Sequence, residues 1–445
     1  MTAQGAPAPS RDIPPYLAAG DLVYRTPPDA RFVRGEGVRL YDTNGRPYLD
    51  AEAANGTLSW GYDASLLTEA CRRALPMPAL PSFCESELRL RVVQRLADRL
   101  SAAVGVPGRV ALELGGAQGI EMAMRIVAAN RGGGPVLVFQ GAYHGRSPFT
   151  AHLSASARYR SNQPWPGPQV VRLPYPDCRS CPHRPAAGGC NPACAAGLER
   201  LGTDDCFGLP TADAPQGTAA FLLEPMLNVG GCVVPDPAHV RRLTDHVRSL
   251  GGLIVVDEIF TGLHRLGPEW GFQLHGIQPD IVVASKALTN GALAFSCVWA
   301  REPLASPEVF PPGSHSSTFA GSPLGLAVVD TVLDRWDAWH DVEASVGRLR
   351  DTLAKGLSRI AESSELVRAV DVLGGVARVT LSGPYATRLR ALAAERPDRP
   401  GLLLASTGMA PATVVLHPPL VTSTEDAEEM TELLGRAVDD LEREL

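Results

Sequence analysis

The sequence lacks a long hydrophobic run. No apolar stretch in its 445 residues approaches the roughly 20 residues that a membrane-spanning helix needs. The alanine- and proline-rich residues 1–15 also lack the apolar segment of a secretory signal. We therefore expect a cytoplasmic protein that has no membrane partner.

An excess of basic charge is also missing. The chain has 41 lysines and arginines against 48 acidic residues, for a net charge of −7. Binding of nucleic acid needs a basic face that neutralises phosphates, so we expect no nucleic-acid partner. Hydrophobic residues make up 45% of the chain and charged residues 20%, which is typical of globular proteins and argues against disorder. The length predicts two or three domains.

Cysteine is sparse but clustered. Four of the nine cysteines share the spacing C-x2-C-x8-C-x3-C in a loop rich in proline and glycine, with His183 nearby: Cys178, Cys181, Cys190 and Cys194. This pattern is compatible with a structural zinc site, with an iron–sulfur site, or with a reduced loop that binds no metal. Cys206 lies close by. The remaining four are expected to be small buried hydrophobes: Cys71, Cys84, Cys232 and Cys297.

Short apolar runs alternate with helical patterns between residues 110 and 300. Strands are expected at 110–114, 136–139, 219–223, 253–257 and 281–284, and helices at 119–129 and 237–250. This alternation predicts an α/β fold with a mostly parallel sheet that is covered by helices.

The two ends of the chain read differently from its middle. We expect a hairpin within 31–49 and a helix over 86–104. Helical residues up to 362 precede strands at 376–381 and within 413–420, and helices at 384–395 and 424–444. The ends together predict a smaller α+β domain. The expected division is 1–60 for the arm and part of this domain, 61–325 for the large domain, with an insertion at about 174–210, and 326–445 for the rest of the small domain.

Polar groups follow two of the expected strands directly. Asp257 and Glu258 end the run LIVVDE, and Lys286 follows DIVVAS. Ligands of open α/β sheets bind at the carboxyl ends of the strands, and desolvation there can make a lysine amine nucleophilic. Taken singly, the acids could form an ordinary solvated loop and the lysine could lie on the surface.

Two further features are expected at the same edge. Gly115 and Gly116 precede a helix, whose first N–H groups favour a phosphate, and Tyr143 follows the strand at 136–139. A glycine pair or a tyrosine is by itself only a turn or a packing residue. A phosphate cradle, a flat aromatic ring, an acid and a lysine together match pyridoxal phosphate (PLP).

The sequence closely resembles the class III (omega-type) aminotransferases, a family of fold-type I PLP enzymes. The resemblance extends from RLYDTNGRPYLD through EPMLNVGGCVVP, VVDEIFTGLHRLG and ASKALTNG to SSTFAGSPLG and LHPPLV. It implies that Lys286 is the Schiff-base lysine and proton carrier and that Asp257 pairs with the pyridine nitrogen. The other residues that it implies at the cofactor are Gly116, Ala117, Tyr143, His144, Glu224, Ile259 and Thr318.

The resemblance also implies the reaction and the assembly. The family moves an amino group from an amine to a carbonyl compound in two half-reactions. Its phosphate contact at the position of Thr318 comes from the neighbouring subunit, so a homodimer with shared active sites is expected.

The chain departs from the family at the substrate carboxylate. Val229 stands where many relatives have a glutamate, and Val415 where they have its arginine partner. Residues 400–417 contain no arginine, and Phe260 replaces a polar residue. Gln118 replaces a common acid, a smaller change. We expect at least one substrate to lack an α-carboxylate, such as a terminal amine, an aldehyde or ketone of specialised metabolism, or a modified peptide end, unless an unidentified residue binds that group.

Other functions remain open at this point. An aminomutase or a racemase of the same fold would need no external acceptor. A non-catalytic protein that retains the cofactor is a further alternative, although the intact Lys286 and Asp257 argue against it. A metal-binding module on the cysteine loop would add to an enzyme and would not replace it.

Overall fold

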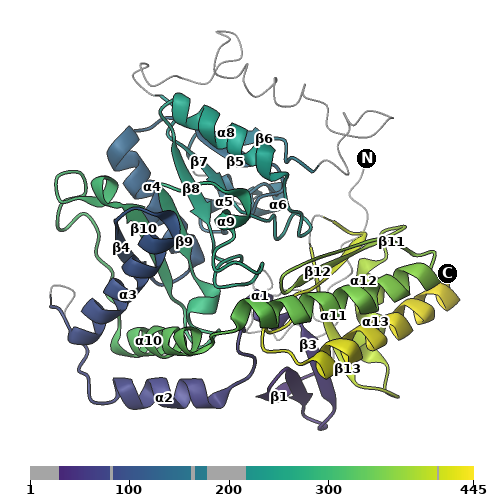
Figure 1. Cartoon of the computed structure of the whole chain (residues 1–445). Helices are drawn as coiled ribbons and strands as arrows, with labels where there is room; N and C mark the ends of the chain where they lie inside the picture. Colours follow the sequence, from purple (N-terminus) through teal and green to yellow (C-terminus); the bar gives the residue numbers. More distant parts are fainter. Residues whose placement is uncertain (1–29, 81–83, 162–165, 178–216, 408–409) are drawn as a thin grey trace, which may run out of the picture.

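The computed structural model describes residues 30–80, 84–161, 166–177, 217–407 and 410–445. Two seven-stranded sheets organise this part of the chain (Figure 1). The larger sheet has the order β4-β10-β9-β8-β7-β5-β6. Its strands are β4 (Gly108–Glu113), β5 (Val136–Phe139), β6 (Val170–Leu173), β7 (Ala220–Leu223), β8 (Leu253–Asp257), β9 (Ile281–Ala284) and β10 (Ser296–Arg301).

The larger sheet is mostly parallel, as the alternating pattern predicts. The pairs β6–β5, β5–β7, β7–β8 and β8–β9 are parallel, and only β10 runs against its neighbours. β5, β7, β8 and β9 are buried throughout, which explains why they read as unbroken apolar runs.

Helices cover both faces of this sheet. Val255 and Val283 share a core cluster with Ile120 of α4 (Gly116–Arg131). Side chains of the opposite strand face, such as Val256, belong to a second cluster that includes residues of α3 (Glu87–Val104) and α8 (Pro237–Ser249). Since side chains alternate along a strand, one strand supplies both clusters.

The smaller sheet has the order β1-β2-β3-β13-β14-β12-β11 and is antiparallel except for β3 with β13. Its strands are β1 (Phe32–Glu36), β2 (Arg39–Asp42), β3 (Pro47–Ala51), β11 (Val367–Leu373), β12 (Val376–Leu381), β13 (Gly401–Ser406) and β14 (Thr413–Leu416). Figure 1 shows the purple N-terminal strands beside the yellow C-terminal elements. Both ends of the chain therefore build this sheet, as expected; the exact domain boundaries remain a prediction.

The remaining helices complete the two layers. They are α1 (Ala53–Gly56), α2 (Ala64–Ala74), α5 (Thr150–Leu153), α6 (Ala157–Arg160), α9 (Phe272–His275), α10 (Pro323–Ala338), α11 (Val342–Ser363), α12 (Ala386–Glu395) and α13 (Thr424–Glu444), with the 3-10 turns η2 (Lys286–Leu288) and η3 (Glu302–Ala305). None of the described helices is long and apolar enough to cross a bilayer.

Several elements differ from the expectations. The hairpin within 31–49 is a three-stranded meander, because a second reversal at Gly37 joins β1 to β2. Four strands have no counterpart among the expected ones: β6, β10, β11 and β13. Short apolar runs without alternation do not distinguish such strands from helix or loop.

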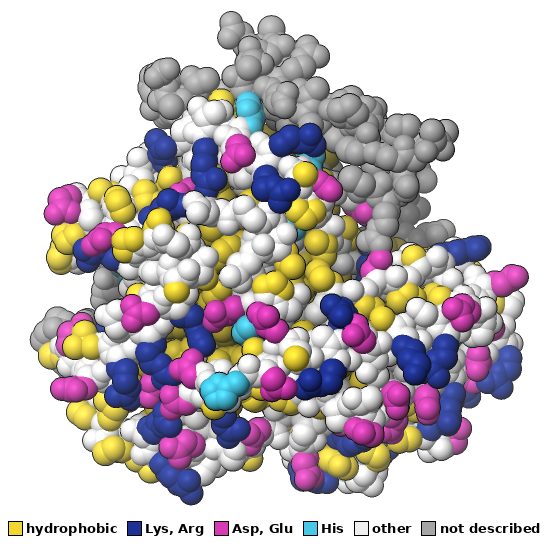
Figure 2. Space-filling view, in the orientation of Figure 1, with side chains coloured by type: hydrophobic (Ala, Val, Ile, Leu, Met, Phe, Trp, Pro, Cys, Tyr) yellow, Lys and Arg dark blue, Asp and Glu magenta, His cyan; other side chains and the backbone are white. Residues whose placement is uncertain are grey.

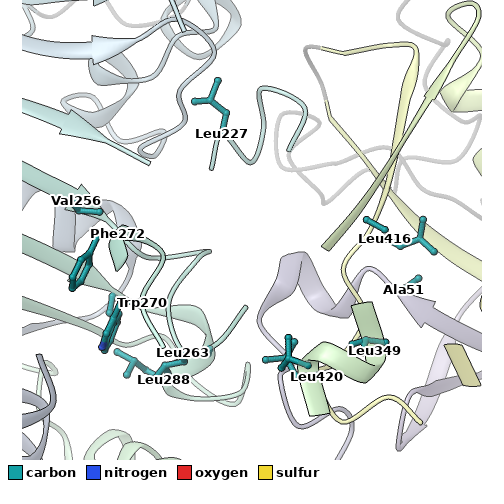
Figure 3. Packing of buried hydrophobic residues seen from close by; sticks show 14 of the residues in the cluster. Ala51, Leu227, Val256, Leu263, Trp270, Phe272, Leu288, Leu349, Leu416 and Leu420 are labelled. Atoms are coloured by element: carbon teal, nitrogen blue, oxygen red, sulfur yellow. The ribbon is translucent and has the colours of Figure 1, made fainter. Parts of the chain in front are cut away.

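The largest core cluster joins the two sheets. It includes Val256 of β8 and Leu416 of β14, together with Trp270 and Leu420 from the connecting segments (Figure 3). On the surface, basic and acidic side chains are intermixed over the face that Figure 2 shows. The shared core fixes the position of the small sheet relative to the ends of the parallel strands.

Candidate active site

Asp257 and Lys286 lie at the same edge of the larger sheet. Asp257 is the last residue of β8 and is opposite Val283 of the parallel strand β9, whereas Lys286 follows β9 by two residues. Lys286 has a φ of 42°, in the left-handed region that costs a residue with a side chain about 1–3 kcal/mol. Strain of this kind is concentrated at functional sites.

The Lys286 amine points towards the N-terminal segment of the chain. Its Nζ donates a hydrogen bond to the Asn55 carbonyl oxygen at 2.9 Å and lies 4.9 Å from the centre of the Phe260 ring. Burial lowers the pKa of Lys286 to about 8, although the negative charge of Asp257 acts in the opposite direction. A minority of the Lys286 population, roughly a fifth at pH 7.4, is therefore neutral and able to act as a nucleophile or base, far more than at the ordinary lysine pKa.

Asp257 is buried and is held by two partners. One carboxylate oxygen accepts a hydrogen bond from the Ile259 backbone N–H at 3.1 Å, and the other lies 2.8 Å from Nδ1 of His144. An ionised carboxylate only accepts hydrogen bonds, so it favours the His144 tautomer with the proton on Nδ1. The buried Nε2 of His144 has no hydrogen-bond partner among the described residues, which leaves it free for a ligand.

Glu224 follows β7 directly and fixes the turn that carries Tyr143. Its carboxylate accepts hydrogen bonds from the backbone N–H of Tyr143 at 2.8 Å and of Asn228 at 3.2 Å. Burial raises the pKa of Glu224 to about 7, while His144 acts in the opposite direction. Glu224 thus orders two backbone segments beside Asp257.

The Tyr143 ring is half-buried and packs against an aromatic neighbour. The rings of Tyr143 and Tyr159 meet edge to face with centres 5.5 Å apart. The guanidinium carbon of Arg146 lies 4.8 Å from the centre of the Tyr159 ring and 5.7 Å from that of Tyr143. These contacts set the orientation of the ring at the edge of the sheet.

Small residues occupy the start of helix α4. Gly115 is its N-cap and has no side chain to occupy the first backbone N–H groups of the helix. A Cβ atom added to Gly116 would lie 2.9 Å from Cδ1 of Ile259. Gly116 therefore allows Ile259 to approach the start of the helix, and Ala117 follows in the first turn. Free N–H groups at the positive end of the helix dipole favour an anion.

Glu258 has a different role from its neighbour Asp257. It turns into the protein and accepts hydrogen bonds from the backbone N–H groups of Gly271 at 3.0 Å and Phe272 at 2.7 Å, and from the Thr261 hydroxyl. Burial raises its pKa to about 7. Glu258 is thus a structural acid.

Thr318 is exposed, in contrast to the other residues that the resemblance implies at the cofactor. Its side chain is exposed in the segment before α10, next to Phe319, which is 66% exposed. Its expected contact is with a partner subunit, so its role remains a prediction.

An apolar cluster surrounds Val415, which stands at the position of the family's carboxylate-binding arginine. Phe260 and Val415 are both buried, and they belong to one small cluster whose other members are Met226, Cys232, Leu266 and Val376. The Phe260 ring also meets the His417 ring edge to face, with centres 5.3 Å apart. Val229 is only partly buried. The side of the Lys286 amine that Phe260 faces is therefore apolar.

Two contributions from the N-terminal segment were missed in the sequence. Glu52 caps α1 through the Asn55 backbone N–H, and burial raises its pKa to about 7. Asn55 supplies the carbonyl that binds Lys286. All four residues of α1 have positive φ, and the φ of Asn55 is 59°. The dipeptide Asn55-Gly56 is a turn signal that could have indicated this irregular segment.

The cysteine pattern cannot be placed. Cys178, Cys181, Cys190, Cys194 and the nearby Cys206 lie outside the described residues. Within the described residues, no group of three or more His, Cys, Asp or Glu side chains is arranged to hold a metal. Cys232 and Cys297 are buried, as expected of small hydrophobes, whereas Cys71 and Cys84 are only partly buried.

The observed groups fit PLP. The amine of Lys286 can bind its aldehyde, the Asp257 carboxylate can pair with its ring nitrogen, and the start of α4 can hold its phosphate. The unpaired Nε2 of His144 and the small residues at Gly115 and Gly116 agree with a bound polar group at this edge.

Comparison with known proteins identifies the family. Residues 24–438 match the family described as aminotransferase class-III. A diaminobutyrate–2-oxoglutarate aminotransferase from Rhizobium meliloti is 29% identical, over 92% of this chain and 87% of its own. An acetylornithine aminotransferase from Mycolicibacterium smegmatis is 28% identical, over 94% of this chain and 95% of its own.

Solved structures share the fold. An ornithine aminotransferase from Toxoplasma gondii has a TM-score of 0.79 at 24% identity, covering 97% of this chain and 94% of its own. A PMP-bound aminotransferase from Vibrio fluvialis has a TM-score of 0.81 at 22% identity, covering 93% of each chain. The expected fold, with its mostly parallel large sheet and smaller second layer, is confirmed.

Proposed function

Because this chain belongs to the class III aminotransferases, which use PLP, we propose that it transfers an amino group between an amine and a carbonyl compound, at least one of which lacks an α-carboxylate. The observation that carries this proposal is the convergence of Lys286 and Asp257 at one edge, next to the apolar wall of Phe260 and Val415. Small molecules of specialised metabolism and peptide ends are the substrate classes that suit such a wall.

PLP, when bound, supplies an aldehyde that condenses with amines and a ring that accepts the electrons of a carbanion. Asp257 would pair with the ring nitrogen and keep it protonated, and the contact with His144 holds the carboxylate in place. Lys286 would hold the aldehyde carbon. In its neutral form the Lys286 Nζ would also take a proton from the substrate carbon and return it as a general acid.

The apolar wall selects the substrate. Val415 stands where many relatives have an arginine, so the guanidinium that would form paired hydrogen bonds with an α-carboxylate is missing at this position. The Phe260 side chain excludes water from the same space. Neither Phe260 nor Val415 has a hydrogen-bond donor on its side chain, so these two residues alone cannot compensate the desolvation of an ionised carboxylate. An amine on an alkyl or aromatic chain loses little by entering there.

Replacement of Lys286 by Ala tests the function. We expect the visible absorbance of bound cofactor to change and amino transfer to fall by at least about 10⁴-fold, because both the covalent link and the proton carrier are removed. Full activity of Lys286→Ala would refute the assignment.

A labelled nitrogen experiment separates the alternatives. Transfer of ¹⁵N from an amine donor to a second molecule is expected of an aminotransferase. An aminomutase or a racemase would retain the label within one substrate, and a non-catalytic PLP-fold protein would move none.

We propose further that the protein is a cytoplasmic homodimer in which Thr318 reaches the partner's phosphate site. Its exposure before α10 supports this arrangement. The spacing of Cys178, Cys181, Cys190 and Cys194 supports a structural zinc site. Metal analysis of the purified protein should find about one zinc per chain, and the zinc should be lost when all four cysteines are changed to Ser. A wild-type protein that contains no metal would exclude the site.

A further inference from the structure

Four side chains form a row across the smaller sheet. In the strand register, Ala405 is opposite Val415, Val415 is opposite Arg378, and Arg378 is opposite Asp371. Directly opposite residues of antiparallel strands project from the same face of a sheet. Arg378 therefore lies beside Val415 on the same face, one strand away from the position at which relatives carry their arginine.

This face of the sheet is directed towards the candidate active site. Val376 lies two residues before Arg378 on the same face of β12, and it shares the apolar cluster with Val415, Phe260 and Cys232. Phe260 is the residue whose ring lies 4.9 Å from the Lys286 amine. The row thus borders the cluster that forms the wall of the site.

Arg378 is only partly engaged by the protein. Its side chain is 16% exposed, and its buried Nε has no hydrogen-bond partner among the described residues. Asp371 forms its ion pair at 4.0 Å, the outer limit of such contacts. Burial raises the pKa of the Cys232 thiol to about 12, and Arg378 and Lys286 both act on this thiol in the opposite direction. Cys232 therefore lies within electrostatic range of both cations.

We propose that Arg378 binds the carboxylate of the amino-acid or oxo-acid substrate in one half-reaction, and that Asp371 holds the guanidinium in the other. This inference rests on the proposed function. Adjacent strands are only about 4.8 Å apart, a distance that the long arginine side chain can cross over the small Val415. A guanidinium binds a carboxylate through paired, charge-assisted hydrogen bonds.

The arrangement explains how one site can accept two kinds of substrate. A carbonyl or amine without a carboxylate contacts Phe260 and Val415 while Arg378 stays with Asp371. A substrate carboxylate that enters takes the place of Asp371 as the partner of the Arg378 guanidinium. The buried guanidinium therefore has an acidic partner in both half-reactions.

The test compares two acceptors in enzyme charged with an amino group. The first acceptor is an oxo acid, chosen as whichever of pyruvate and 2-oxoglutarate reacts faster with the wild type, and it carries a carboxylate. The second acceptor is hexanal, which has none. In Arg378→Gln we expect KM for the oxo acid to rise about 10- to 100-fold, with kcat and the hexanal kinetics changed less than about threefold, because a charge-assisted contact is lost. Arg378→Lys should recover part of the loss. Arg368→Gln, an exposed arginine of β11, is the matched control.

Binding without turnover gives a second measurement. Glutarate, an unreactive dicarboxylate, should inhibit hexanal turnover in the wild type and in Arg368→Gln about 10- to 100-fold more tightly than in Arg378→Gln. Equal oxo-acid KM and glutarate inhibition in wild type and Arg378→Gln would overturn the role of Arg378, as would a wild type that uses hexanal but neither oxo acid. A wild type that transfers nitrogen to none of these acceptors, or to any other carbonyl, would instead refute the proposed function.

Discussion

The two seven-stranded sheets contribute to one site in different ways. The larger sheet presents the ends of parallel strands, where Asp257 ends β8 and Lys286 follows β9 by two residues. The smaller sheet presents a face, on which Val415 and Arg378 lie side by side. The positions of catalytic groups at a strand end depend on the residue at which each strand ends. Selection on a sheet face depends on cross-strand register, so a charged group can move to the neighbouring strand and still face the same space.

The largest effect is expected at the strand end. Asp257→Asn removes the charge that would pair with the ring nitrogen and the charged acceptor of His144. Because the ring would no longer be held protonated as the electron acceptor, kcat should fall roughly a thousandfold, which corresponds to about 4 kcal/mol of activation free energy. This loss should affect carboxylate-bearing and carboxylate-free substrates equally, in contrast to Arg378→Gln.

Glu258→Gln is the matched control for Asp257→Asn. It alters an adjacent buried acid that binds the backbone of Gly271 and Phe272, so it should lower the melting temperature while the folded enzyme keeps its kcat. If Asp257→Asn lost only stability, or only its carboxylate-bearing substrates, the division of roles between the two sheets would be wrong.

A smaller effect concerns stability against pH. Burial raises the pKa of Glu224 from an ordinary value near 4.5 to about 7. A carboxyl group with a raised pKa in the folded state stabilises the fold fully below pH 4.5, and this contribution is lost as the pH rises to about 7. Glu224→Gln, which does not titrate, should remove at most about 3 kcal/mol of this pH dependence in the cofactor-free protein.

Urea unfolding at a series of pH values between 4 and 8 measures this slope. Glu432→Gln, an exposed change on α13, should leave the slope as it is in the wild type. An unchanged slope in Glu224→Gln would show that the pKa of Glu224 is the same in the folded and the unfolded protein, and would contradict this prediction.

Much of the larger sheet was predictable because its strands are buried on both faces. β5, β8 and β9 occupy the residues expected of them, and the residues after β8 and β9 were recognisable as a site. β10 was not predicted, since its antiparallel direction is a property of the neighbours it pairs with. Asn55 was missed for a similar reason: its carbonyl meets Lys286 across 231 positions in the chain.

The sequence by itself determined the chemistry of this protein: which strands are buried, that a lysine and an acid follow two of them, and that the usual arginine is replaced by Val415. Only the tertiary structure decided which groups share one space, because register and strand order are set by pairing between distant segments. It brings His144 to Asp257 and the Asn55 carbonyl to Lys286, and it places Arg378 beside Val415.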